Sequence, residues 1–239
     1  MTIFDILKAG IELGIENDFR QRKAVLSYSW TEKISTNKGR ELINPYADTG
    51  IVSANNLELP VECVAVGIDI GQDEILTVQA WEERTGKKVD LFISHHPRGY
   101  PAGTFPSILK TQLGNLGSFG IKTAELEKYF DRQTKTMQRS NLEPNFGRTY
   151  STVKLLEKNY IALHTPMDNI SARLVAKEID ESGAKTLAEC MNALKKIPEY
   201  QIVAKEFGVH PVILSGKPED DIGKLLSVAS GRARRIFAP

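Results

Sequence analysis

The sequence predicts an α/β fold in which parallel or mixed sheets are covered by helices. Residues 61–68 are a short apolar run rich in valine, residues 73–84 carry apolar side chains at helical spacing, and residues 89–94 are a second apolar run. Strand, helix and strand in this order form a βαβ unit with parallel strands. A third apolar run, residues 160–164, adds a strand. Because helices cover both faces of parallel sheets, the pattern indicates an α/β protein.

Length and composition are those of a globular chain. The 239 residues suffice for one large or two small domains. We expect a single α/β unit over residues 1–239, with two lobes at about 1–120 and 121–239 as the alternative. A formal net charge of +1 gives no overall attraction to nucleic acid or to anionic lipid, so neither is expected as a partner.

We expect a cytoplasmic protein, because the sequence shows no targeting signal and because its cysteines are few and far apart. No apolar stretch reaches the ~18 residues that span a membrane, and the N-terminus lacks the pattern of a signal peptide. Cys63 and Cys190 lie far apart without a CxxC partner, which is typical of reduced and buried cysteines.

The N-terminal part is predicted to begin with a helix. Thr2 can cap it, and Asp5 follows at the spacing of a capping box. We expect this helix to continue through the charged residues 16–22 and to end before Ser27. Residues 30–60 contain two glycines and two prolines, and we expect loops there with remnants of helix.

The remaining elements follow from similar patterns. The glycine-rich residues 97–120 are expected to be either a mobile flap over the second strand's end or a surface loop that leads into a short helix. Residues 211–214 are predicted to be a strand. Helices are predicted over residues 121–140, 152–158, a segment capped by Asn169 or Ser171 and ending near 181, 186–196 and 200–207.

Two adjacent histidines, His95 and His96, stand where the apolar run of residues 89–94 ends. Successive side chains on a strand point to opposite faces, so only a distorted strand end lets both rings converge. Imidazole is a common ligand of borderline divalent ions. Two ions ~3.5–4 Å apart fit adjacent histidines better than one, because each ring can then bind its own ion. The alternative is a solvated loop.

A second cluster, His164-Thr165-Pro166-Met167-Asp168, follows the third apolar run. His164 and Asp168 supply a nitrogen and an oxygen ligand within one short segment. The alternative role of Asp168 is to cap the next helix. Both clusters lie at strand ends, where ligands of α/β sheets gather, and together they hold three of the four histidines. We therefore interpret them as one metal site.

Asp69 follows the first predicted strand in the segment Gly67-Ile68-Asp69-Ile70-Gly71. Actin-like and sugar-kinase ATPases open with a similar segment. Here, however, Asp73 and Glu74 occupy the place where a phosphate would have to bind. We therefore interpret Asp69 as a carboxylate beside the metal site or at the edge of the core.

Two further features have ordinary explanations. His210 precedes the predicted strand of residues 211–214, so it belongs to the opposite rim of a parallel sheet and is expected to be structural. The basic end is interpreted as solvated, with a phosphate or nucleic-acid contact as the alternative. Its arginines are Arg232, Arg234 and Arg235.

Residues 89–97 and 161–169 together resemble the Nif-three-like family, whose members are often described as type-two GTP cyclohydrolase I homologues. In that family a strand, a helix and a strand ending in His-His-Pro precede a later strand that ends in His-Thr-x-x-Asp. Asp48-Thr49-Gly50-Ile51 also looks like the family's early Asp-x-Gly-Leu element. The resemblance covers residues 45–180 well and the remainder loosely.

The resemblance implies a Nif-three-like α/β fold, two divalent metal ions per subunit, and homo-oligomers from dimers to hexamers. By position, His95 and His96 would each bind one ion, and Asp168 would be a further ligand. His164 would act as a ligand, a proton carrier or a neighbour that positions the others, and we assign it as the catalytic candidate. Imidazole ligands suit Zn, Mn, Fe, Co or Ni better than Ca.

One departure from the family concerns the C-terminal region. The family completes its site with a His and a Glu four residues apart near the C-terminus, whereas no histidine follows His210 in this chain. Either the chain is a shortened version or its site is incomplete.

Two classes of function are compatible with these patterns. The first is a metal-dependent hydrolase that acts on a nucleotide, a phosphoester or a similar small molecule; GTP cyclohydrolase activity in particular rests on the resemblance alone. The second is a non-enzymatic, oligomeric metal-binding adaptor that recruits other proteins.

Overall fold

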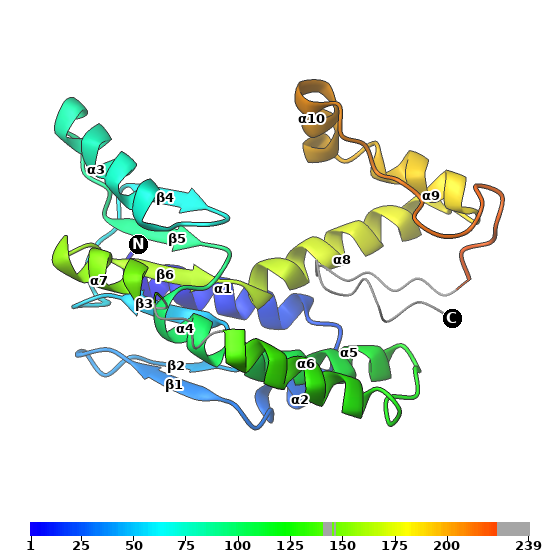
Figure 1. The fold of residues 1–239 in the computed structure, drawn as a ribbon, viewed down its shortest axis with the longest axis horizontal. Helices are drawn as coiled ribbons and strands as arrows, with labels where there is room; N and C mark the ends of the chain where they lie inside the picture. Colours follow the sequence, from blue (N-terminus) through cyan, green and yellow to red (C-terminus); the bar gives the residue numbers. More distant parts are fainter. Residues whose placement is uncertain (141–144, 146, 224–239) are drawn as a thin grey trace. The chain divides into compact units, whose positions relative to one another are not determined.

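The computed structural model describes residues 1–140, 145 and 147–223, and the chain divides into two compact units, Met1–Met167 and Asp168–Pro239 (Figure 1). The division falls after Met167, whereas the two-lobe alternative to the expected single unit placed it near residue 120. Its physical cause is the strand β6 (Tyr160–Leu163), which lies inside the central sheet of the first unit. The helices that precede this strand belong to the first unit as well.

The first unit is built on a four-stranded sheet with the order β3-β6-β5-β4. Strands β4 (Val64–Gly67), β5 (Leu91–Ser94) and β6 run parallel, and β3 (Thr49–Ser53) pairs antiparallel with β6. The helix α3 (Gln72–Thr85) connects β4 to β5. The α/β fold and the βαβ unit are thus confirmed, with a mixed sheet.

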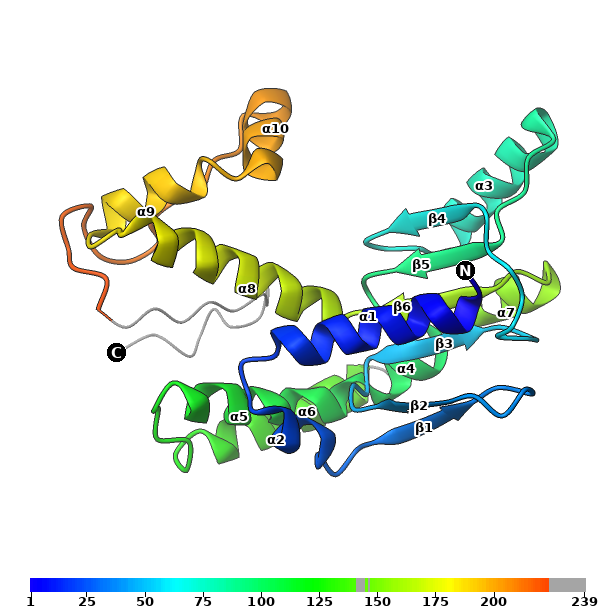
Figure 2. The same ribbon diagram turned by 180° about the vertical axis from the view of Figure 1, so that it is seen from behind.

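The two faces of the sheet are covered by different helices (Figures 1 and 2). Leu91, Ile161 and Leu163 pack in a cluster with the apolar side chains of α1 (Ile3–Asn17). Side chains of alternate residues point to the other face, where Phe92 and Tyr160 pack with residues of α3 and α7 (Arg148–Leu155). The inner strands are consequently apolar up to Ser94 at the end of β5, which is why they appear as continuous runs in the sequence.

Helix α1 begins with the predicted capping box, in which the Thr2 hydroxyl accepts from the backbone of Asp5 and the Asp5 carboxylate accepts from that of Thr2. The helix ends at Asn17, earlier than expected, and a separate short helix α2 (Arg22–Leu26) follows. Two glycines let α1 lie close to the chain around His164. A Cβ at Gly10 would lie 2.9 Å from Leu163, and one at Gly14 would lie 2.7 Å from Pro166.

The expectation of loops over residues 30–60 was wrong. That region forms the antiparallel pair β1 (Glu32–Ser35) and β2 (Glu41–Asn44), followed by β3. Gly39 lies in the turn of this hairpin with a positive φ of 76°, and Gly50 lies within β3. The glycines that suggested loops therefore serve a hairpin turn and a strand.

Residues 97–120 are helical from Gly99 to Ser118, which differs from the expected surface loop leading into one short helix. They form α4 (Gly99–Thr104), the 3₁₀ helix η1 (Phe105–Lys110) and α5 (Thr111–Ser118). The helix α6 (Glu127–Ser140) then packs against η1 and buries Phe130, Thr134 and Met137.

The second unit contains most of α8 (Thr165–Ser182), together with α9 (Leu187–Leu194) and α10 (Pro198–Phe207). Helix α8 begins directly after β6, before the predicted caps Asn169 and Ser171, and Asp168 lies in its first turn. Residues 211–214, which were predicted to be a strand, are irregular and partly exposed. Among the described residues they pair with no strand of either sheet. None of the described helices is long and apolar enough to cross a membrane.

Candidate metal centre

The register of the central sheet brings the predicted ligands to one edge. Gly67, Ser94 and Ala162 are register partners on the three parallel strands, so these strands end at the same edge of the sheet. His95 therefore lies beside the start of the loop after β4, and its backbone N–H donates to the Gly67 carbonyl at 2.9 Å. Ligand sites of α/β sheets form at such carboxyl ends.

The antiparallel strand β3 contributes to the same edge with its first residues. Thr49 is the register partner of Leu163, so Asp48 arrives next to His164 from the opposite chain direction. The Thr49 hydroxyl accepts from the backbone N–H of His164 at 3.2 Å. The end of β6 and the beginning of β3 therefore lie side by side and place the Asp48 carboxylate beside the His164 imidazole.

Three histidines converge at this edge. The rings of His95 and His164 stack with centroids 4.6 Å apart, and the His96 ring lies 5.0 Å from that of His95. One ligand nitrogen of each of the three residues lies within 4.8 Å of the others. The cluster of His95, His96 and His164, which we call the histidine cluster, can therefore hold a metal ion.

Carboxylates orient two of the three rings. The Nδ1 atom of His164 lies 2.7 Å from Asp48 Oδ2, and Nδ1 of His96 lies 3.0 Å from Asp69 Oδ1. A ring that donates its Nδ1–H to a carboxylate presents the lone pair of Nε2, and this arrangement is usual for metal-binding histidines. The interpretation of Asp69 as a carboxylate beside the site agrees with this contact.

The two carboxylates differ in burial. Asp48 is completely buried and also accepts a hydrogen bond from the Thr165 hydroxyl at 2.6 Å. Asp69 has a side chain that is 57% exposed and is shared with Arg98, whose guanidinium donates to the same oxygen at 3.0 Å. The His164 side of the cluster is therefore enclosed, and the His96 side is open to solvent.

The environment of His95 favours the neutral ring. Burial, followed by the nearby His164 and His96, lowers the pKa of His95 to about 4, against an opposing hydrogen bond to the Leu163 backbone. The ring is therefore neutral at physiological pH. A neutral imidazole is the form that binds a metal ion.

The chemistry of these donors fits a divalent ion. Three imidazoles with two carboxylates behind them suit Zn, Mn, Fe, Co or Ni, whereas Ca prefers oxygen ligands. His164, assigned from the sequence as the catalytic candidate, belongs to the donor set itself. Asp168 lies in the first turn of α8 and is the first residue of the second unit, so its role as a ligand stays a prediction.

Sequence reasoning did not assign Asp48 to the site. The likeness of Asp48-Thr49-Gly50-Ile51 to a family element was the signal available for it. His210 is exposed and lies outside the histidine cluster, and Cys63 and Cys190 are free. The basic end with Arg232, Arg234 and Arg235 lies outside the described residues.

Comparisons with known proteins support the fold. No protein-family model and no curated protein matches the sequence. Among solved structures, a NIF3 superfamily protein from Sphaerobacter thermophilus matches with a TM-score of 0.59 and 20% sequence identity. The match covers 82% of this chain and 62% of the Sphaerobacter chain. The chain thus shares its fold with a NIF3 superfamily protein, as the resemblance of its two histidine segments predicted.

Proposed function

We propose that the protein is a metal-dependent hydrolase of a nucleotide or phosphoester-type substrate, with its reaction centre at the histidine cluster. The observation that carries the proposal is the convergence of three imidazoles, two of them oriented by carboxylates, at the carboxyl edge of the sheet. A divalent ion bound there would supply Lewis acidity and a water of lowered pKa. The proposal includes up to two ions per subunit.

The protein's own groups divide the remaining tasks. Asp48 holds the Nδ1–H of His164, so this ring keeps one orientation and one tautomer. Asp69 contacts Nδ1 of His96 on the open side, where a substrate can approach from solvent. Asp168 is proposed as an additional carboxylate ligand because it follows His164 by four residues.

His164 has two candidate roles, and metal content separates them. As a ligand, which its place in the donor set favours, it should be as necessary for metal binding as His96. As a proton carrier, its replacement should lower turnover by ~10²-fold or more and leave most of the metal bound. We expect His164→Ala and His96→Ala to lose similar amounts of metal in elemental analysis of the purified protein.

The test of the hydrolase proposal is activity on a broad panel of phosphoesters and nucleotides. Hydrolysis should require added divalent metal and disappear in the His95→Ala, His96→Ala double variant. His210→Ala is the matched control, because this exposed histidine lies outside the cluster. Metal-loaded protein without activity, or activity that survives the double variant, would contradict the proposal.

The second candidate is a non-enzymatic metal-binding adaptor. Its support is the same histidine cluster, because such a cluster can hold an ion without turning over a substrate. Inactive protein that binds metal through the three histidines would support this candidate.

We also propose a homo-oligomer, from a dimer to a hexamer. Its support is the edge strand β4, where Val66 and the following Ile68 are 71% and 65% exposed. An open strand edge with apolar side chains favours pairing with another chain. Light scattering that gives a monomer of 26.6 kDa at micromolar concentration would contradict this.

A further inference from the structure

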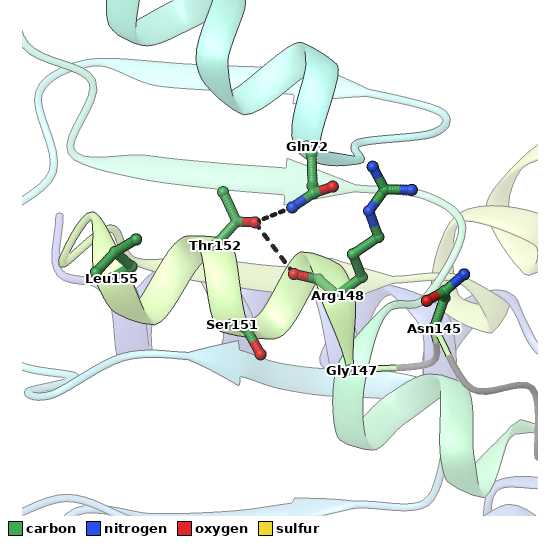
Figure 3. Close-up of a pocket in the computed structure, with 7 residues that line it drawn as sticks. All are labelled: Gln72, Asn145, Gly147, Arg148, Ser151, Thr152 and Leu155. Carbon is green, nitrogen blue, oxygen red and sulfur yellow. Dashed lines mark hydrogen bonds between the residues drawn. The ribbon is translucent and has the colours of Figure 1, made fainter.

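A second feature of the first unit is a pocket of about 510 Å³ between the beginnings of α3 and α7 (Figure 3). Gln72 enters it from α3, and Arg148 and Thr152 enter it from α7. The Gln72 amide donates to the Thr152 hydroxyl, which in turn donates to the Arg148 carbonyl. The first bond links α3 to α7, and the second lies within α7.

Arg148 supplies the positive charge of this pocket. It is exposed, and among the residues that the structure describes it forms no ion pair and no carboxylate lines the pocket. The other polar side chains of its lining are neutral amides and hydroxyls. Arg98, in contrast, is already bonded to Asp69. A free guanidinium next to amide donors is suited to bind an anionic group, and a phosphate accepts its paired N–H groups in parallel.

The pocket lies close to the histidine cluster along two routes. Gln72 follows Asp69 by three residues, which span at most about 11 Å, and Asp69 contacts His96 at 3.0 Å. On the other side, Gly99 follows Arg98 and lies against α7, where a Cβ at Gly99 would be 3.7 Å from that of Tyr150. The segment that follows His96 therefore adjoins α7, which carries Arg148.

We propose that Arg148 and Gln72 form an anion subsite that binds a phosphate group of the substrate whose reaction takes place at the histidine cluster. The proposal rests on the hydrolase function above. It restricts the substrate of that hydrolase to molecules that carry a second anionic group away from the bond that is cleaved. Such a molecule would bridge the open His96 side of the cluster and the pocket.

The experiment is a calorimetric titration of inorganic phosphate at low ionic strength into the His95→Ala, His96→Ala double variant. This background removes two metal ligands, so phosphate bound to metal does not contribute. Adding Arg148→Gln should weaken phosphate binding ~10-fold, and Arg148→Lys less, because an ammonium keeps the charge but lacks the paired donors. Arg84→Gln, an exposed arginine in the last turn of α3, is the control and should change the affinity less than twofold.

The outcomes separate this subsite from the hydrolase proposal. Equal phosphate affinity with and without Arg148→Gln, or an equal loss in Arg84→Gln, would overturn the subsite. Phosphate binding that depends on Arg148 supports it even if the metal-loaded protein proves inactive, because the titration requires neither metal nor turnover. Circular dichroism of each variant verifies that the fold is retained.

Discussion

The two histidine and carboxylate pairs of the site have similar contacts in different surroundings. His164 and Asp48 are 2.7 Å apart, with the carboxylate completely buried and bonded to Thr165 as well. His96 and Asp69 are 3.0 Å apart, but both side chains are about half exposed and Asp69 also binds Arg98. One pair belongs to the core of the sheet, and the other lies at the surface.

This difference indicates separate tasks for the two sides of the site. A buried hydrogen bond to a charged group is strong and expensive to break, whereas exposed ion pairs contribute little because water screens them. The His164 side therefore provides a fixed ring, and the His96 side can adjust to an incoming ligand. The following experiments test this comparison.

The largest effect, on metal affinity, is expected when the buried carboxylate of Asp48 is replaced. Asp48→Asn should weaken metal binding by ~10–100-fold, because a neutral amide holds an Nδ1–H of His164 less strongly than a carboxylate does. Asp69→Asn should weaken it by only a fewfold, since its pair is screened by solvent. Competition with a metal chelator measures both affinities. Equal losses in the two variants would remove the distinction between the two sides.

The next effect is on stability and concerns the close packing of α1 at Gly14 against Pro166, two residues after His164. Gly14→Ala places a Cβ 2.7 Å from the Pro166 backbone, so we expect a loss of ~1–3 kcal/mol in the free energy of unfolding. Gly71→Ala, near Asp69, meets only the flexible end of Glu74 at 3.3 Å and should change stability much less. Urea denaturation provides both values. A larger loss from Gly71→Ala would show that the Asp69 side is the more rigid one.

A smaller effect, on stability, is expected from the hydroxyl of Thr165, which also contacts Asp48. Thr165→Val removes the hydroxyl that donates to the buried carboxylate at 2.6 Å and should cost about 1–2 kcal/mol of stability. Thr165→Ser keeps the hydroxyl and should retain most of the wild-type stability. Thermal unfolding of both variants distinguishes the hydrogen bond from the lost methyl group, and equal changes would assign the effect to packing.

The smallest effect comes from another partly exposed carboxylate, Asp5. The hydrogen bond from Arg40, and then those from Thr2, hold the pKa of Asp5 well below its ordinary value. Because the folded pKa is the lower one, the stabilisation is complete above about pH 4, the unfolded value, and is lost as the pH falls below it. Asp5→Asn should lower Tm slightly at pH 7 and approach the wild-type Tm near pH 2. A constant difference between pH 7 and pH 2 would contradict the assignment.

Several elements of this molecule follow from local sequence patterns. The Thr2 and Asp5 capping box starts α1 as predicted, because both partners lie within one helical turn. The strands that end before His95 and His164 were predicted from apolar runs, since inner strands of a parallel sheet are buried on both faces. The short strands β1 and β2, on either side of the turn at Gly39, gave no comparable pattern and were missed.

The sequence by itself therefore determined that three histidines stand at strand ends in an α/β protein. Only the tertiary structure decided which strands are neighbours, and with them which side chains meet. Asp48 and His164 are 116 residues apart, and their contact depends on the antiparallel pairing of β3 with β6. Such a long-range pairing is decided by burial and hydrogen bonding across the whole sheet, which leave no local periodicity in the chain.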